Sequence, residues 1–306
     1  MSKPILRRQN PDEIETLARR AVDAELLIQV TGIVEDVRLG GLEAVREHAQ
    51  RLGDLPDSGG LIRTRPELVA AWEQLDTDQR ALLARTAQRI RTVAEAQRRA
   101  LSDIEVEVPG GRAGHAVIPV GRAGCYAPGG RYPLPSSVLM TVTTARSAGV
   151  ETVWVASPRP GPVTLAAAAV AGANGLLAAG GAQAIAALAY GAAEIPASDV
   201  VVGPGNQYVT AAKHLVSADV AIDMLAGPSE ILILADSTAD ARLVAADLLA
   251  PAEHEPQAGP IRVSQDPGQI ETVNSELPRQ LESLPTADIA WAALKNGFSV
   301  LATDLD

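Results

Sequence analysis

From Val138 to the end of the chain, short apolar runs alternate regularly with helical segments. Alternation of this kind is typical of parallel sheets whose strands are joined by right-handed helical crossovers. We therefore predict an α/β fold with two Rossmann-like parallel-sheet domains and a helical N-terminal segment. The predicted helices span residues 139–148, 163–171, 182–190, 206–216, 239–250, 268–283 and 287–296. The predicted strands span residues 152–156, 175–179, 200–202, 231–235, 261–263 and 298–302.

The first hundred residues have helical patterns instead. Asn10-Pro11-Asp12-Glu13 is typical of a helix start, with an N-cap, a proline in the first turn and acids against the helix dipole. Further helices are predicted over 32–51, from about Arg65, and over 77–101. One face of the last helix carries Leu83, Ala87, Ile90, Ala94 and Leu101.

Short strands joined by a turn are predicted between Ile104 and Ala127, where the pattern alternates around Pro109-Gly110-Gly111. We place a domain boundary in this region. The predicted domains are an N-terminal helical segment (1–30), a first α/β domain (31–125 together with 237–306) and a second Rossmann-like α/β domain (126–236).

Composition agrees with this fold class and excludes some functions. Hydrophobic residues make up 47% of the chain and aromatics only 3%, so the core consists mostly of small and branched aliphatic side chains, as in parallel sheets between helices. The net charge of −11 disfavours binding to nucleic acid, whose phosphates would repel it. The stretch 164–193 carries no charge, but its glycines fall at turn-like intervals, so we expect helix, buried strand and helix rather than a membrane span.

Cys125 is the single cysteine, so no intramolecular disulfide can form and a reducing compartment is expected. The N-terminus turns polar at once, which predicts no secretory signal. We therefore expect a cytoplasmic protein. A catalytic role for the thiol is disfavoured because no His or Lys stands near Cys125 in the sequence.

Glycine-rich loops occupy positions where ligands bind in open parallel sheets, at the carboxyl ends of strands. Glycine lets the main chain approach a ligand closely, and free N–H groups at a helix start favour an anion such as a pyrophosphate. No Gly-x-Gly-x-x-Gly follows a strand, so the ordinary dinucleotide fingerprint is absent. The loops are Tyr126-Ala127-Pro128-Gly129-Gly130, Gly180-Gly181-Ala182-Gln183, Gly203-Pro204-Gly205-Asn206 and Gly227-Pro228-Ser229-Glu230.

Glu253-His254-Glu255 is the one segment with the composition of a metal site. A catalytic zinc site needs about three protein ligands, and a helix-terminal His that bonds exposed carbonyls explains this segment equally well. The other histidines have less support. His48 is expected at the surface, His115 has no partner motif, and His214 with Lys213 is expected to be a solvated pair near a helix end.

Several long motifs in the same order resemble the histidinol dehydrogenase family, and the resemblance runs from about residue 10 to the last residue. They are RAGCYAPGG at 122–130 with Tyr132-Pro133 and PSSVLM at 135–140, GGAQAIAALAYG at 180–191, VGPGNQYV at 202–209, IDMLAGPSE at 222–230, and DLL at 247–249 with AEH at 252–254.

The resemblance implies an NAD-dependent homodimer that oxidises an amino alcohol to an amino acid through an aldehyde, with one zinc per site. It implies that Tyr126, Gln183 and Asn206 contact NAD. It also implies that Ser229 and His254 contact the amino alcohol substrate, L-histidinol or a related compound, and that His254 is a zinc ligand.

Two departures from the family pattern set the expectations for catalysis. Pro251 stands where the family has a Gln zinc ligand, and proline offers a metal no side-chain donor. The Glu-His pair that serves the family as acid and base has no counterpart in this sequence, which leaves His254 and Glu253 as weak candidates. We therefore expect no high-affinity zinc site of the family type.

Three hypotheses follow. The chain is an NAD-dependent dehydrogenase that works without zinc on histidinol or an altered substrate. Alternatively, it is a catalytically impaired relative that binds nucleotide or a partner protein. The third reading is a truncated fragment of a full-length dehydrogenase, which would expose apolar surface.

Overall fold

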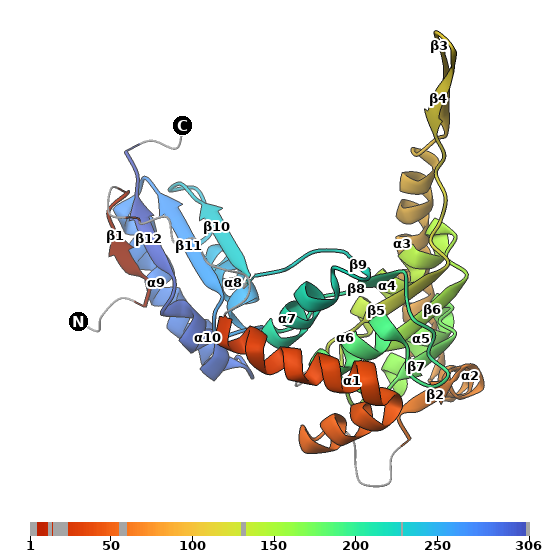
Figure 1. The fold of residues 1–306 in the computed structure, drawn as a ribbon. Coiled ribbons are helices and arrows are strands. Elements are labelled where there is room, and N and C mark those ends of the chain that lie inside the picture. Colours follow the sequence, from red (N-terminus) through yellow and green to blue (C-terminus); the bar gives the residue numbers. More distant parts are fainter. Residues whose placement is uncertain are drawn as a thin grey trace. The chain divides into compact units, whose positions relative to one another are not determined.

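A computed structural model of the chain describes residues 5–11, 14, 24–54, 60–129, 133–227 and 229–303. Its internal contacts divide the chain into two compact units. The large unit is Ala21–Ala226, and the small unit combines Met1–Arg20 with Gly227–Asp306. The elements of both units are drawn in Figure 1.

The large unit is built on a sheet with the strand order β2-β7-β6-β5-β8-β9. β2 pairs antiparallel with β7, and the pairs from β7 to β9 are parallel. Its strands are β2 (Ile62–Thr64), β5 (Arg122–Tyr126), β6 (Thr152–Ala156), β7 (Gly175–Leu177), β8 (Val200–Val202) and β9 (Ala221–Ile222). Its helices are α1 (Ala24–Arg51), α2 (Arg65–Gln74), α3 (Thr77–Arg99), α4 (Pro135–Ala148), α5 (Pro162–Ala171), α6 (Gly181–Tyr190) and α7 (Gln207–Val216).

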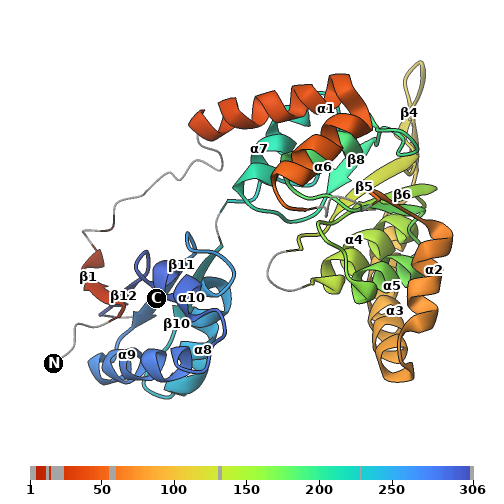
Figure 2. The same ribbon diagram turned by 90° about the horizontal axis from the view of Figure 1, so that it is seen from below.

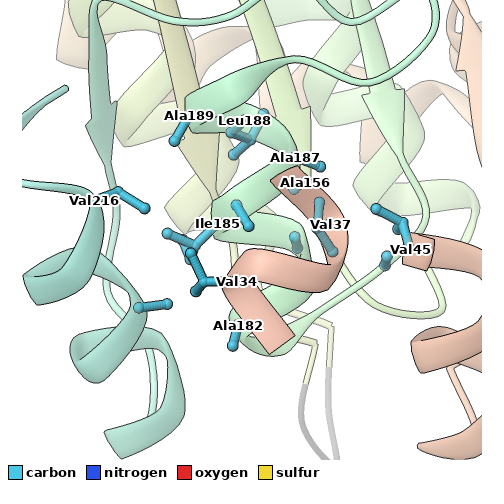
Figure 3. Packing of buried hydrophobic residues seen from close by; sticks show 14 of the residues in the cluster. Val34, Val37, Val45, Ala156, Ala182, Ile185, Ala187, Leu188, Ala189 and Val216 are labelled. Carbon is cyan, nitrogen blue, oxygen red and sulfur yellow. The ribbon is translucent and has the colours of Figure 1, made fainter. Parts of the chain in front are cut away.

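Helices cover both faces of this sheet, as Figure 2 shows. One apolar cluster joins α1, α6 and α7 to the sheet, and a second joins α2, α3, α4 and α5 to the opposite face. In the first cluster Val34 of α1 lies beside Ile185 of α6, and Val37 of α1 lies beside Ala187 (Figure 3). α5 and α6 are rich in alanine, which lets the layers approach closely and matches the low aromatic content.

A hairpin leaves the large unit between α3 and β5. β3 (Ile104–Val108) and β4 (Gly111–His115) pair antiparallel, and every residue of both strands is exposed. Gly110 turns the chain with φ +90°, a conformation that glycine adopts without steric cost. The predicted strands and turn of this region are therefore present, but as a ribbon outside the sheet rather than as a domain boundary.

The small unit has a parallel sheet with the strand order β1-β12-β11-β10. Its core is an apolar cluster contributed by the helices and by the sheet face they cover. On β10, Leu232 and Leu234 are each 58% exposed. The elements are β1 (Arg7–Gln9), β10 (Glu230–Leu234), β11 (Gly259–Ser264), β12 (Phe298–Leu301), α8 (Ala241–Ala252), α9 (Pro267–Leu281) and α10 (Ala287–Leu294).

The α/β fold with parallel sheets is confirmed, and the predicted strands and helices after Val138 lie within a few residues of the observed ones. Glycines in the left-handed region end α4 at Gly149 and α5 at Gly172. The charge-free stretch 164–193 is helix, buried strand and helix, as expected. None of the described helices is long and apolar enough to cross a membrane. The predicted helix start at Asp12 and Glu13 lies outside the described residues.

The structure divides the chain differently from the predicted domains. Residues 31–125 lie in the large unit with 126–226, whereas the sequence grouped them with 237–306. The reason is packing, because α1 buries its apolar face on α6 and α7 while α2 and α3 pack on α4 and α5. The N-terminal helices therefore complete the layers of the large unit.

Two smaller expectations in the N-terminal helices need correction. Leu101 lies beyond the end of α3 and is 58% exposed, so it is not part of the buried face. His48 was expected at the surface but is only 8% exposed, and its ring is hydrogen-bonded to two other polar groups of α1. Its Nε2 is 3.1 Å from Oδ2 of Asp36, and its Nδ1 is 3.0 Å from Nη2 of Arg51.

The close contact between β6 and β7 gives a stability prediction. A Cβ at Gly175 would lie 2.6 Å from the ring of Trp154, so Gly175→Ala should lower the free energy of unfolding by about 1–3 kcal/mol. A Cβ at Gly32 of α1 would meet nothing within 4 Å, so Gly32→Ala should raise it by about 0.5–1 kcal/mol. Urea unfolding of both variants measures this, and equal effects would contradict the packing described here.

Candidate functional site

The order in which the chain adds strands to the large unit's sheet reverses between β5 and β8. The chain runs from β5 outward to β6 and β7, and then returns to place β8 on the other side of β5. In open parallel sheets the crevice at the carboxyl ends of two such strands is where ligands bind. Here those ends are Tyr126 of β5 and Val202 of β8, each followed by a glycine-rich loop.

Tyr126 ties the end of β5 to the start of α6. Its side chain is only 4% exposed, and its Oη accepts a hydrogen bond of 3.1 Å from the N–H of Gly181. Burial, with a smaller contribution from the nearby carboxylate of Asp54, raises the pKa of this phenol to about 12 against the opposing hydrogen bond from Gly181. Tyr126 is therefore neutral at physiological pH and keeps its O–H as a donor.

Gln183 lies on the first turn of α6, near the carboxyl ends of the strands. Its buried side-chain amide has no partner among the described residues. The residue is 1% exposed, and neither its Oε1 nor its Nε2 has a hydrogen-bond partner among the residues that the structure describes. Leaving a buried amide unpaired costs free energy, whereas a ligand that offers both a donor and an acceptor removes the cost. Gln183 is therefore fitted to recognise an uncharged polar group.

Asn206 holds the start of α7 instead of lying free in the loop. Its Oδ1 accepts hydrogen bonds from the N–H groups of Tyr208 at 3.1 Å and Val209 at 3.2 Å, which makes it the N-cap. The residue itself is exposed. The N-terminus of α7 is thus already satisfied by the protein, and an approaching ligand meets the exposed Asn206 side chain.

Gly203, directly after β8, has a main chain held from both sides. Its N–H donates to Oδ2 of Asp223 at 2.8 Å, and its carbonyl accepts from Nζ of Lys213 at 3.0 Å. Lys213 and Asp223 also form an ion pair. Lys213 is 4% exposed, so the expectation of a solvated pair with His214 is wrong for Lys213, whose side chain turns inward to this loop, while His214 is exposed.

Asp54 is a site residue that the sequence did not indicate. It follows α1, and its Oδ2 accepts the N–H of Gly180 at 3.0 Å, across 126 positions of chain. Burial raises the pKa of this carboxyl, against the opposing effects of the Gly180 bond and the charge of Arg159. Arg159 has a φ of +45°, which is unusual for a side-chain-bearing residue and often accompanies function. Only the fold brings these residues together, so no local pattern could have revealed them.

Cys125 precedes Tyr126 on β5 and is fully buried. Burial raises the pKa of its thiol to about 12, so the reactive thiolate does not form near neutral pH. This position agrees with the expectation that the thiol has no catalytic role.

The predicted substrate residues, Ser229 and His254, belong to the small unit. The structure joins Ser229 to the residue that follows His254, because the N–H of Ser229 donates to Oε1 of Glu255 at 2.5 Å. Glu253 is the C-cap of α8, and its Oε2 accepts from Oγ1 of Thr286 at 3.2 Å. His254 is exposed on this turn.

These residues do not make a zinc site by themselves. Both flanking carboxylates of His254 already accept hydrogen bonds, and Pro251 lies in the last turn of α8 without a donor atom. Within the described part of the chain, no group of three or more His, Cys, Asp or Glu side chains is placed to hold a metal ion.

Comparison with known proteins gives consistent matches. The family model described as histidinol dehydrogenase matches residues 17–306. The histidinol dehydrogenase of Thermus thermophilus is 46% identical over 292 residues, which cover 94% of this chain and 70% of that protein. That of Aromatoleum aromaticum is 41% identical over 288 residues, covering 92% of this chain and 66% of that protein.

A solved structure agrees as well. The crystal structure of histidinol dehydrogenase from Elizabethkingia anophelis superposes with a TM-score of 0.87 at 29% identity, covering 100% of this chain and 72% of that one. The chain therefore spans roughly two thirds of the length of the proteins that it matches.

The buried phenol predicts a pH dependence of stability. Because the folded pKa of Tyr126 is about 12 against its usual 10.0, the native state keeps a proton that the unfolded chain releases. Its stabilising effect is complete below pH 10 and is lost between about pH 10 and 12, a loss on the order of 2–3 kcal/mol. The free energy of unfolding of Tyr126→Phe should fall less steeply with pH in this window than that of the wild type. Identical pH profiles of unfolding would contradict it.

Proposed function

Because the chain belongs to the histidinol dehydrogenase family, we propose that it is an NAD-dependent oxidoreductase acting on an amino alcohol, L-histidinol or a related compound. We further propose that it works without the family's zinc, as a cytoplasmic homodimer. The membership in this family is the observation that supports the reaction class. The unpaired amide of Gln183, at the carboxyl edge of the large unit's sheet, supports NAD as the cofactor.

The residues of the large unit fit a dinucleotide. Gln183 offers a buried donor and acceptor, Tyr126 offers a neutral hydroxyl, and the exposed Asn206 adds an amide at the β8 loop. Some of the main-chain N–H groups at the start of α6 are already engaged within the protein, since those of Gly180 and Gly181 donate to Asp54 and Tyr126. Recognition therefore rests on uncharged groups more than on a vacant helix N-terminus. When bound, NAD accepts the hydride from the carbinol carbon.

The small unit supplies the candidates for substrate contact and proton transfer. Ser229 and His254 would contact the amino alcohol, and His254, with an exposed imidazole, is the first candidate to accept the hydroxyl proton. Glu253 is the weaker candidate because its carboxylate is already engaged by Thr286. Absence of zinc from the reaction is supported by Pro251, which offers a metal no donor at the position where the family has a Gln ligand.

A second candidate function is nucleotide binding without turnover. It is favoured by the geometry at His254, whose side chain has no hydrogen-bonded carboxylate partner among the described residues to orient or activate it. Such a relative would bind NAD but would not reduce it.

Turnover separates the two candidates. With purified protein, NAD and L-histidinol or related amino alcohols, we expect NADH absorbance to appear, at a rate that dialysis against a chelator leaves unchanged. His254→Ala should reduce the rate by about 10²–10⁴-fold, as for loss of a general base. NAD binding without NADH formation would support the second candidate, and a rate restored only by added zinc would contradict the zinc-free proposal.

A matched pair of variants tests whether Gln183 binds the cofactor. Gln183→Met removes a buried, unpaired amide, so the free energy of unfolding should stay equal or rise by about 1 kcal/mol, while affinity for NAD falls at least about tenfold. Gln269 of the small unit is 5% exposed, and its amide atoms are also unpaired. Gln269→Met should therefore change stability similarly and leave NAD affinity unchanged. Equal NAD binding by both variants, measured by calorimetry, would remove Gln183 from the pocket.

A further inference from the structure

The most unusual polar arrangement in the large unit surrounds a single glycine peptide. Gly203 is the first residue after β8, and its N–H and C=O lie beyond the hydrogen bonds of the strand. Asp223, just after β9, accepts from the N–H at 2.8 Å, and Lys213 of α7 donates to the carbonyl at 3.0 Å. The ion pair between the two side chains closes the ring, which we name the Gly203 clamp.

The clamp holds Gly203 in a conformation that other residues could not adopt. Its φ is +124°, and a side chain here would overlap the carbonyl oxygen of Tyr126. The main chain after β8 therefore passes directly against that of β5, three positions before Asn206. Two of the three residues assigned to NAD thus take their relative position from this contact.

Stability alone does not explain an ionic clamp. Lys213 is 4% exposed, whereas the side chain of its partner Asp223 is 33% exposed. Removing the ammonium group from water carries a desolvation cost, and a carboxylate that remains in contact with water offsets only part of it. Apolar side chains of similar volume often stabilise a core equally well. They cannot, however, hold a peptide N–H and a peptide carbonyl in fixed directions. The distinctive property of the pair is therefore geometric.

We propose that Lys213 and Asp223 are positioning residues of the cofactor pocket, an inference that rests on the proposed function. They do not touch the dinucleotide. They fix the Gly203 peptide against Tyr126 and thereby set the distance between the phenol of Tyr126 and the loop that carries Asn206. Asp223 extends the same control to the next residue, since its Oδ1 accepts the N–H of Met224 at 2.7 Å.

The test separates positioning from stability. Lys213→Met leaves a carboxylate without its cation and should lower both the urea midpoint and NAD affinity. The double variant Lys213→Met with Asp223→Leu removes both charges, so its urea midpoint should lie above that of Lys213→Met. It should stay below that of the wild type, because the buried N–H and carbonyl of Gly203 lose their partners. Its affinity for NAD should stay at least about tenfold weaker, with KM for NAD rising more than kcat falls.

A second comparison does not depend on recovery of the double variant. Asp223→Asn keeps an oxygen that can accept the N–H of Gly203, whereas Asp223→Ala does not. At a temperature where both are folded, Asp223→Asn should bind NAD more tightly than Asp223→Ala. Lys295, an exposed lysine after α10, supplies the control, since Lys295→Met should bind NAD as the wild type does.

The outcomes are distinct. A folded double variant that binds NAD like the wild type would overturn the proposal, because the pair would then be structural only. Equal NAD affinity of Asp223→Asn and Asp223→Ala would overturn it as well. A wild-type protein that does not bind NAD would refute the proposed function, and the inference with it.

Discussion

The parallel pairing of β5 with β8 is the constraint on which the arrangement of the site depends. Its register, with Ala123 opposite Val200 and Cys125 opposite Val202, brings the end of one strand level with the end of the other. Tyr126 and Gly203 then follow side by side, and only a glycine allows the two main chains to approach so closely. The loops with Gln183 and Asn206 are placed relative to this pair through α6 and α7.

The polar groups of the candidate site are largely neutral or internally paired, which is compatible with the proposed dinucleotide cofactor in an acidic protein. Asp54 is bonded to Gly180, Lys213 is paired with Asp223, and the buried phenol of Tyr126 is protonated. Gln183 differs from them in having an amide that no other described residue pairs with. Polar groups of this kind recognise a ligand by its shape and hydrogen-bond pattern more than by its net charge.

Much of the fold could be predicted from the sequence because its signals are local. Apolar runs, helix caps and glycines such as Gly149 place the predicted ends of helices and strands within a few residues of the observed ends. The glycine-rich loops likewise indicated the edge of the sheet where a ligand would bind, whereas the choice of Tyr126, Gln183 and Asn206 came from the resemblance to the family. Contacts between distant segments carry no such signal. Asp54 reaches Gly180 across 126 positions, and Lys213 turns inward although a lysine near a helix end is usually solvated. The packing of α1 on α6 overrode the predicted domain division for the same reason.

The most direct test of this account is a crystal structure of the chain with bound NAD. The account predicts electron density for the dinucleotide at the carboxyl ends of β5 and β8, with a polar group of the cofactor hydrogen-bonded to the amide of Gln183. Density for NAD at another edge of the sheet, with the amide of Gln183 still unpaired, would contradict it.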